Sequence, residues 1–362
     1  MIGSTLARYF GMRFLGAAAA VFGGIFILVV LVDYVEMTRH ASRVPNASAL
    51  VVAQISFYRV PQVTERIIPF ATLIGAMACY LSLSRRLELV VARAAGISAW
   101  QFISPAVLVA VLMGIAATLV YNPMSAGLRE YSKLLEAELF GERAGPRQAD
   151  AGFWISQRDG EGQAVINASA SRNQGAILDG VTVLTFNAAG QFQERIEAKS
   201  AELEPGYWQL KDATVYGFGA PPRQHASYLL STNLTPEQVR ESFATPETVS
   251  FWHLREYIEL AEQAGLAASG YRLQYQLLLA RPFLLAAMVI LAASVSLRFF
   301  RFGGVTRMVL SGVLAGFLLY VLSKVTEDMS KAELMHPAAA AWLPVFVGGL
   351  TGFVALLYLE DG

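Results

Sequence analysis

The sequence is poor in cysteine and in charge. Its single cysteine, Cys79, lies in an apolar run, which excludes an intramolecular disulfide and a cysteine-rich metal site. Charged residues make up 15% of the chain, whereas ordinary soluble domains carry about 25%. The formal net charge at pH 7 is zero, so the chain lacks the positive field that attracts nucleic acid. We therefore expect no nucleic-acid partner.

The motifs of common hydrolases and nucleotide-binding proteins are also missing. The sequence contains no G-x-x-x-x-G-K-[ST] segment and no Gly-Lys pair, so it cannot bind nucleotide phosphates by that loop. It has neither a G-x-S-x-G elbow nor an H-E-x-x-H helix, and its four histidines match no metal spacing. We expect no catalytic residue, no metal site and no bound cofactor in this chain.

Long apolar runs are the dominant feature of the sequence. A helix needs about 20 apolar residues to cross a bilayer core of roughly 30 Å. Six runs qualify: Phe14–Val32, Ile67–Ser84 with a helix start nearer Ala53, Ala99–Tyr121, Pro282–Leu297 extended back toward Tyr271, Met308–Ser323 and Leu334–Leu359. The first run is longer than the apolar core of a cleaved signal peptide, so we expect it to be kept as a helix.

The arginines predict how these helices are oriented. Short loops on the cytoplasmic side of membrane proteins are enriched in Lys and Arg. One side of the six-helix plan collects Arg8, Arg13, Arg85, Arg86, Arg93, Arg298, Arg301 and Arg307, whereas the other has only Arg39, Arg43 and Lys331 in its short loops. We therefore expect both termini in the cytoplasm and the central segment, residues 122–270, outside it.

That central segment predicts a β-rich domain between two membrane regions, 1–121 and 271–362. Short runs rich in β-branched and aromatic residues alternate with turn residues. The expected strands are Gly152–Ser156, Gln163–Ser169, Gly180–Phe186, Glu194–Glu204 and Trp208–Phe218, followed by a helix near Pro246–Ala264. Their spacing favours a sandwich or jelly roll. The predicted fold class is thus α-helical membrane protein with six transmembrane helices and an inserted all-β, jelly-roll-like domain.

The loop between the second and third runs, near residues 84–98, has the pattern of a short amphipathic helix. Leu87, Val90, Val91 and Ala94 share one helical face, and Gly96 is a suitable helix stop. A helix of this kind suits docking of a cytoplasmic motor. The alternative interpretation is a surface turn whose arginines only set the topology.

The residues of this loop resemble a known family. Glu88–Ser98 closely resembles the loop signature of the LptF/LptG permease family. Further resemblance follows at Val60-Pro61, Ile67–Phe70, Leu73–Ala76, Thr232–Pro236, Leu254–Ile258 and Tyr271–Phe283, so it extends over essentially the whole chain. Glu88–Val91 and Asn233–Pro236 look more like the LptG branch than the LptF branch.

The resemblance implies a membrane subunit of the lipopolysaccharide export ABC transporter. Such a subunit lies in the bacterial inner membrane, with its large domain in the periplasm. Its implied partners are the sister permease LptF, a dimer of the cytoplasmic ATPase LptB, LptC with the periplasmic bridge, and lipopolysaccharide. ATP would be used by the partner ATPase. Within the loop, the implied coupling residues are Arg86, Leu87, Glu88, Val91 and Gly96, with Glu88 contacting a basic residue of the ATPase.

A phosphorylated lipid calls for cations at the outer end of the helices. Guanidinium groups bind phosphate in a bidentate manner. The candidate residues are Arg39, His40, Arg43, Arg59 and Arg66. The alternative is internal pairing, because Asp33, Glu36 and Glu65 are close enough in sequence to neutralise several of them. Asp33 and Gln62 also stand where relatives often carry lysine.

Two glycines of the fifth run, Gly312 and Gly316, have the small-x-x-x-small spacing that permits close helix approach. By resemblance, the first and fifth helices would face the partner permease and frame a lateral gate for lipid. Three other functions remain open: a permease for another lipid or a lipoprotein, a receptor or scaffold that does not transport, and an intramembrane enzyme. The last has no paired catalytic residues within the apolar runs.

Overall fold

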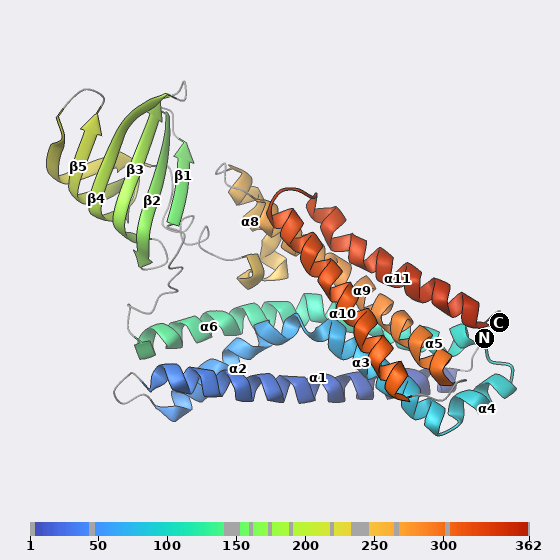
Figure 1. The fold of residues 1–362 in the computed structure, drawn as a ribbon. Coiled ribbons are helices and arrows are strands. Elements are labelled where there is room, and N and C mark those ends of the chain that lie inside the picture. Colours follow the sequence, from blue (N-terminus) through green and yellow to red (C-terminus); the bar gives the residue numbers. More distant parts are fainter. Residues whose placement is uncertain are drawn as a thin grey trace. The chain divides into compact units, whose positions relative to one another are not determined.

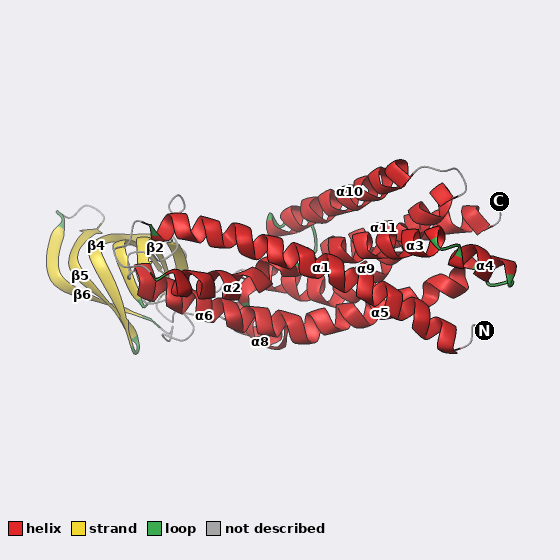
Figure 2. Cartoon of the chain, turned by 90° about the horizontal axis from the view of Figure 1, so that it is seen from below, coloured by secondary structure: helices red, strands yellow, loops and turns green. Residues whose placement is uncertain are grey.

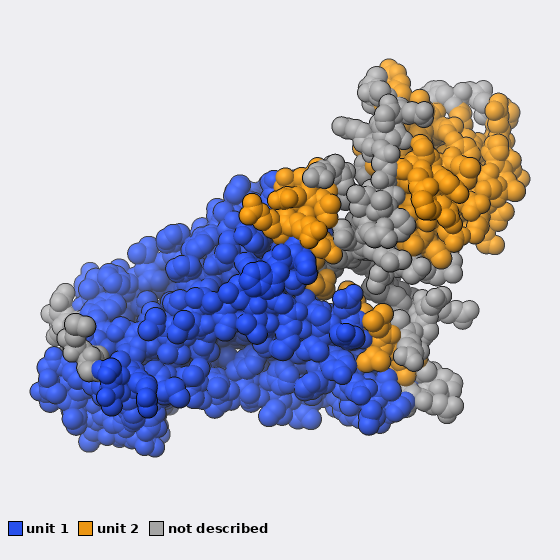
Figure 3. Space-filling model, turned by 180° about the vertical axis from the view of Figure 1, so that it is seen from behind, with its two compact units in different colours: residues 1–132, 250–254, 269–362 blue, residues 133–249, 255–268 orange. Residues whose placement is uncertain are grey.

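The structure is a computed structural model. It describes residues 4–42, 48–140, 153–158, 162–172, 176–187, 191–217, 221–232, 246–263, 268–300 and 305–360 (Figure 1). The chain forms two compact units (Figure 3). The first combines residues 1–132, 250–254 and 269–362, and the second combines residues 133–249 and 255–268.

Helices build the first unit. They are α1 (Ser4–Ala41), α2 (Ala49–Glu65), α3 (Ile68–Arg85), α4 (Glu88–Ala94), α5 (Ala99–Ala116), the π-helical turn η1 (Ala117–Tyr121), α9 (Ser269–Phe300), α10 (Val305–Lys331) and α11 (Pro337–Glu360). Two further helices, α6 (Asn122–Phe140) and α8 (Phe251–Gln263), contribute to both units, and the 3-10 turn η4 (Pro246–Thr248) precedes α8.

Six helical segments within the described residues are long and apolar enough to cross a membrane. They are Ser4–Ala41, Ile68–Arg85, Ala99–Glu136, Ser269–Leu297, Thr306–Lys331 and Pro337–Tyr358. This result confirms the predicted plan of three spans before the inserted domain and three after it. The first span is 38 residues long, which corresponds to about 57 Å of helix and exceeds the roughly 30 Å of a bilayer core.

The second predicted span consists of two helices. We expected one helix from near Ala53, but α2 starts at Ala49, ends at Glu65, and is followed by a separate helix from Ile68. A proline lies near the start of α3, where its missing N–H costs no helical hydrogen bond. The break therefore lies at Arg66 and Ile67.

The third predicted span continues beyond its expected end at Tyr121. Five residues of π-helix follow α5, and the chain then runs on as α6 to Phe140. These α6 residues fall in the segment predicted as β-rich, and those up to Ser132 belong to the helical unit. A π-turn shifts the helical register, and such turns often occur at functional sites.

Threonine hydroxyls from neighbouring helices compensate for two of the prolines within the spans, Pro282 and Pro344. A proline leaves the carbonyl four residues earlier without its helical donor, and no water reaches that carbonyl inside a bilayer. Pro282 leaves the carbonyl of Leu278 without its helical donor, and this carbonyl accepts a 2.9 Å hydrogen bond from Thr118 Oγ1. Pro344 leaves the carbonyl of Ala340 in the same state, and this carbonyl accepts a 3.0 Å hydrogen bond from Thr326 Oγ1. Neighbouring helices thus restore the lost hydrogen bonds.

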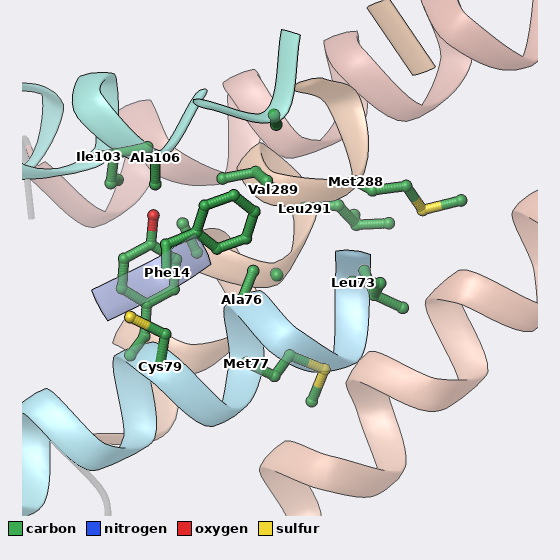
Figure 4. Close-up of a cluster of buried hydrophobic side chains, with 14 of the residues drawn as sticks. Phe14, Leu73, Ala76, Met77, Cys79, Ile103, Ala106, Met288, Val289 and Leu291 are labelled. Carbon is green, nitrogen blue, oxygen red and sulfur yellow. The ribbon is translucent and has the colours of Figure 1, made fainter. Parts of the chain in front are cut away.

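The helices pack around one apolar core and approach closely at glycines. Figure 4 shows side chains from several helices meeting in this core, including Phe14, Leu73, Ile103 and Met288. At Gly75 an added Cβ would lie 2.5 Å from the Cα of Ala18. That glycine therefore allows α1 and α3 to cross almost backbone to backbone.

The second unit contains an antiparallel sheet. Its strands are β1 (Phe153–Arg158), β2 (Gly162–Arg172), β3 (Ile177–Asn187), β4 (Phe192–Glu204), β5 (Tyr207–Gly217) and β6 (Arg223–Ser231). They are hydrogen-bonded in chain order, so every connection joins neighbours. The first five correspond to the predicted strands with shifted ends. The sixth was not predicted, and most of its side chains are exposed, so it lacks the apolar alternation of a core strand.

The sheet curls so that its edge strands meet at one end. Gln157 of β1 donates from Nε2 to the carbonyl of Ser231 at the end of β6, over 2.8 Å. Its Oε1 accepts a bond from Thr232 Oγ1 at 2.6 Å. The apolar residues on the inner face include Trp208 and Leu210, both fully buried. The fold class, a six-helix membrane protein with an inserted β-domain, is as predicted.

Replacing Thr118 or Thr326 with valine should destabilise the helical unit. The change leaves a buried carbonyl without a donor, and we expect a loss of about 1 kcal/mol in the free energy of unfolding. Serine at either position keeps the hydroxyl and should retain most of the stability. Unfolding of the purified protein in detergent measures the effect.

Thr351→Val is the matched control. Its hydroxyl bonds to carbonyls of Val347 and Gly348 within its own helix, where no proline removes a donor. Equal stability of all three valine variants would contradict this account of the prolines.

Candidate functional site

The loop helix α4 lies at the end of the helical unit where both chain termini lie (Figures 1 and 2). Leu87 precedes it with a left-handed φ of 59°, which separates α4 from α3. Gly96 ends it with φ 80°. The N–H of Ile97 bonds to the carbonyl of Ala92 at 3.1 Å, which completes a Schellman-type cap with glycine at the left-handed position. The backbone thus turns sharply before α4, and hydrogen bonds cap the helix at its C-terminal end.

The outer face of α4 is apolar and uncovered in the chain. We call Leu87, Val90, Val91 and Ala94 the docking ridge, and all four are exposed, with Val91 at 67%. The opposite face is buried, with Leu89 at 3%. The buried face anchors α4 to the core, and the exposed ridge has the apolar character of a protein contact surface.

Glu88, the first residue of α4, is tied to the beginning of α1. Its Oε2 accepts a 2.8 Å hydrogen bond from the hydroxyl of Tyr9. Arg13 donates from Nε to the same hydroxyl at 3.1 Å, and its Nη2 lies 3.9 Å from Glu88 Oε1. The Glu88 side chain is 27% exposed, so it can also accept a donor from outside the chain.

A cleft of about 410 Å³ separates the start of α1 from α4. Its lining residues are Leu6, Tyr9, Phe10, Arg86, Glu88, Val91, Ala92, Ala95 and Ile97. Arg86, Glu88 and Val91 of the predicted coupling set therefore share one cleft, and Leu87 lies on the docking ridge. Gly96 serves as the helix stop.

The predicted lipid-binding cations have different environments. Arg59 Nη2 lies 3.1 Å from Asp33 Oδ1 and forms an ion pair between α1 and α2. Internal pairing, the alternative interpretation, therefore describes Arg59. Arg39 and His40 are exposed at the end of α1, and Arg66 is exposed at the break between α2 and α3. Arg43 lies outside the described residues.

A buried ion pair lies beside the same helix break. Arg281 Nη1 donates to Glu65 Oε1 at 2.5 Å, and the two side chains are only 12% and 6% exposed. Asn122 Nδ2 and Ser125 Oγ also donate to the Glu65 carboxylate, at 2.9 and 2.8 Å. We call these four residues the buried hub. It joins the end of α2, the start of α6 and the middle of α9.

The hub extends to neighbouring segments. Asn122 Oδ1 accepts the backbone N–H of Phe251 at 2.8 Å. Tyr121, in the π-turn, lies 2.7 Å from Thr64 Oγ1 and donates to the carbonyl of Pro61. We did not predict the hub, because Glu65 was considered only as a neutraliser of nearby arginines. The sequence signal was an arginine and an acid at the edges of apolar runs, a costly placement that usually indicates a pair.

Gly312 and Gly316 pack within the chain. An added Cβ at Gly312 would meet the side chain of Met77, and one at Gly316 would meet Leu73, both on α3. The spacing therefore permits close approach of α10 to α3, and a role in a lateral gate stays a prediction.

The faces of α1 and α10 that point away from the core are apolar and exposed. In the most apolar 18-residue stretch of each helix, only 6% of α1 and 22% of α10 is buried, whereas 61% of α3 and of α9 is buried. Figure 2 shows α10 at the edge of the helical unit. These are the two least covered spans of the described chain.

The described residues contain no group of three or more His, Cys, Asp or Glu side chains placed to hold a metal ion. The predicted absence of a metal concerns the whole chain and stays a prediction. The chemistry concentrated in the described part of the chain is that of contact surfaces and ion pairs.

Comparison with known proteins shows that nearly the whole chain matches a single family. Residues 8–358 match the family described as lipopolysaccharide export system permease LptF/LptG. The lipopolysaccharide export system permease protein LptG of Escherichia coli (strain K12) is 23% identical over 334 residues, covering 88% of this chain and 89% of its own length. LptG of Haemophilus influenzae is 22% identical over 338 residues, covering 90% and 91%.

Breaking the buried hub should strongly destabilise the helical unit. Glu65→Ala leaves Arg281 buried without its partner, and we expect a loss of about 3 to 5 kcal/mol in unfolding free energy. Replacing both residues with methionine should recover much of that loss, since no buried charge remains. Thermal unfolding in detergent measures both variants.

The exposed pair Lys324–Asp328, at 2.9 Å, provides the control. Asp328→Ala should cost about 1 kcal/mol or less, because exposed pairs contribute little. If Glu65→Ala were no more destabilising than Asp328→Ala, the hub would not hold these helices together.

Proposed function

The chain belongs to the LptF/LptG family of lipopolysaccharide export system permeases, and on this premise we propose that it is a permease subunit of an ATP-driven lipopolysaccharide exporter. It takes lipopolysaccharide from the outer leaflet of the bacterial inner membrane and passes it to a periplasmic bridge. The relatives named LptG support placing the chain in that branch. The chain itself is not catalytic, and the energy comes from ATP used by a partner ATPase.

The docking ridge is the observation that carries this proposal. A single-chain membrane protein has no need for a capped helix that exposes Leu87, Val90 and Val91 while burying Leu89. A dimeric ATPase of the LptB type is the proposed partner. Apolar knobs provide grip for such a contact, and a charge such as Glu88 fixes its register.

The orientation follows from the position of α4. Its flanking arginines, Arg85, Arg86 and Arg93, support a cytoplasmic position by the positive-inside rule. Both termini lie at the same end of the helical unit, so they too are cytoplasmic. The inserted β-domain is then periplasmic, where it connects to LptC and the bridge.

The exposed faces of α1 and α10 support a lipid path. Their low burial suits helices that contact the sister permease LptF and frame a lateral opening for lipid. Arg39, His40 and Arg66 are the exposed cations proposed to contact lipid phosphate. Arg59 is proposed instead to stay with Asp33, because their pairing at 3.1 Å already neutralises it.

Charge reversal at Glu88 should stop export without removing the protein from the membrane. Glu88→Lys repels the basic residue expected on the ATPase and breaks the bond to Tyr9. We expect loss of lipopolysaccharide export in cells, with unchanged protein level in the membrane fraction. The same change at Glu256, an exposed acid of α8, is the control and should leave export intact.

Normal export in Glu88→Lys would rule out the coupling role of this residue. Failure of an ATPase to co-purify with the unaltered protein would instead favour a receptor or scaffold. Co-purification of a different lipid, or of a lipoprotein, would favour the other permease function.

Charge reversal at the outer cations should weaken lipid binding. Losing one charge-assisted contact to phosphate costs about 1.5 to 3 kcal/mol, so Arg39→Glu and Arg66→Glu should each weaken lipopolysaccharide binding about tenfold or more. Cross-linking of bound lipid and lipid-stimulated ATP hydrolysis measure the effect in the complex. Arg307→Glu is the control, because Arg307 lies at the start of α10, on the side of the membrane proposed as cytoplasmic. Unchanged lipid binding in both outer variants would refute their assignment.

A further inference from the structure

The polar contacts that the structure describes between α4 and α1 all involve Glu88, which lines the cleft. The cleft between them has a volume of about 410 Å³ and mostly apolar walls, including Leu6, Phe10 and Ile97. Because this space keeps the walls apart, side-chain packing between the two helices is incomplete there. The contact that closes the gap runs from Tyr9 to Glu88, at 2.8 Å.

This link has two points of attachment on α1. Tyr9 and Arg13 are four residues apart, so they lie on the same face of the helix. Arg13 donates to the Tyr9 hydroxyl at 3.1 Å, and its guanidinium carbon lies 5.3 Å from the centre of the Tyr9 ring. Tyr9 accepts from Arg13 and donates to Glu88, so the three side chains form a chain of directed hydrogen bonds.

Glu88 has capacity for a second partner. An ionised carboxylate offers about four acceptor positions, and within the described part of the chain Glu88 contacts Tyr9 and Arg13. Its side chain is 27% exposed beside the docking ridge. One carboxylate can therefore be held by α1 on one side and by a docked protein on the other.

α1 is largely uncovered along its most apolar stretch, whereas Phe10 and Phe14 near its beginning are buried in the core. It is the least buried span of the described chain, and it crosses α3 closely where Ala18 meets Gly75. Along the axis of α1, Tyr9 lies nine residues, or about 14 Å, before that crossing. On the other side, Leu31 in the exposed part of α1 lies thirteen residues, or about 20 Å, after it. A displacement at Tyr9 is thus applied well away from the crossing.

We propose that Tyr9 and Arg13 are positioning residues that couple α4 to α1 through Glu88, so that movement of a docked motor is passed directly to α1. The inference rests on the proposed function, since it requires a motor on the docking ridge. It adds that the first helix receives the motion at its own beginning, through a hydrogen-bonded link.

Distance measurement between two helices in the assembled complex tests the link. Spin labels are attached at Leu28→Cys on α1 and Leu350→Cys on α11, both more than 60% exposed, while the native Cys79 is buried. The distance is compared between the nucleotide-free complex and the complex trapped with ADP and vanadate. Co-purification of the ATPase is measured on the same samples.

Tyr9→Phe and Arg13→Gln should keep the ATPase bound while reducing the nucleotide-dependent distance change to less than half of its unaltered value. Phenylalanine keeps the ring and loses only the hydroxyl, so folding should be preserved. Tyr358→Phe and Arg8→Gln are matched controls at the same end of the helices, and they should retain the full change.

Two results would overturn the link. One is a full distance change in Tyr9→Phe and Arg13→Gln with the ATPase bound. The other is no change in the unaltered complex although the ATPase is bound. If the unaltered protein fails to retain any ATPase, the proposed function fails, and the link fails with it.

Discussion

The exclusion of water from the bilayer core is the constraint on which the rest of the structure depends. Inside that layer every carbonyl and every charge needs a partner within the protein. The hydroxyls of Thr118 and Thr326 serve the carbonyls that prolines leave unpaired. Glu65 and Arg281 neutralise each other, with Asn122 and Ser125 occupying further acceptor positions. The helical unit is thus held together by internally satisfied polar contacts as well as by its apolar core.

The exclusion of water also bears on the apolar surfaces that the chain itself leaves uncovered. The docking ridge on α4 is apolar and exposed, and the helix is capped at its C-terminal end. The outer faces of α1 and α10 are apolar along most of their length. These features fit the proposed assembly, with a motor at α4 and a lipid path along the exposed spans. In that proposal the residues of this chain bind partners and transmit force.

Much of the architecture could be predicted because long apolar runs report directly on the bilayer. The six spans follow from the length of these runs, and five of the strands follow from runs of β-branched and aromatic residues between turn residues. The π-turn at Ala117–Tyr121 could not be predicted, because it lies in apolar sequence that is compatible with a continuous helix. The break at Arg66 and Ile67 was missed although Pro69 follows closely, which is a helix-boundary signal. β6 was missed because an exposed edge strand lacks apolar alternation.

Some parts of the candidate site could be predicted and others could not, because only some of them are local in sequence. The loop signature identifies α4 and its exposed ridge, which are local in sequence. The partners of Glu65 and Arg59 are set by helix packing. The sequence could name Asp33 among the possible partners of Arg59, but it did not indicate Arg281 as the partner of Glu65. The bond from Tyr9 to Glu88 joins residues 79 positions apart, and no local pattern indicates it.

Site-specific photo-cross-linking at the docking ridge tests the central claim most directly. A photo-reactive amino acid is placed at Val91, with Leu229 in β6, also well exposed, as the reference position. In intact cells the probe at Val91 should form a covalent adduct with a cytoplasmic ATPase, and the probe at Leu229 should not. Absence of that adduct, or labelling of position 91 from the periplasmic side, would contradict the claim that a motor acts on this chain through α4.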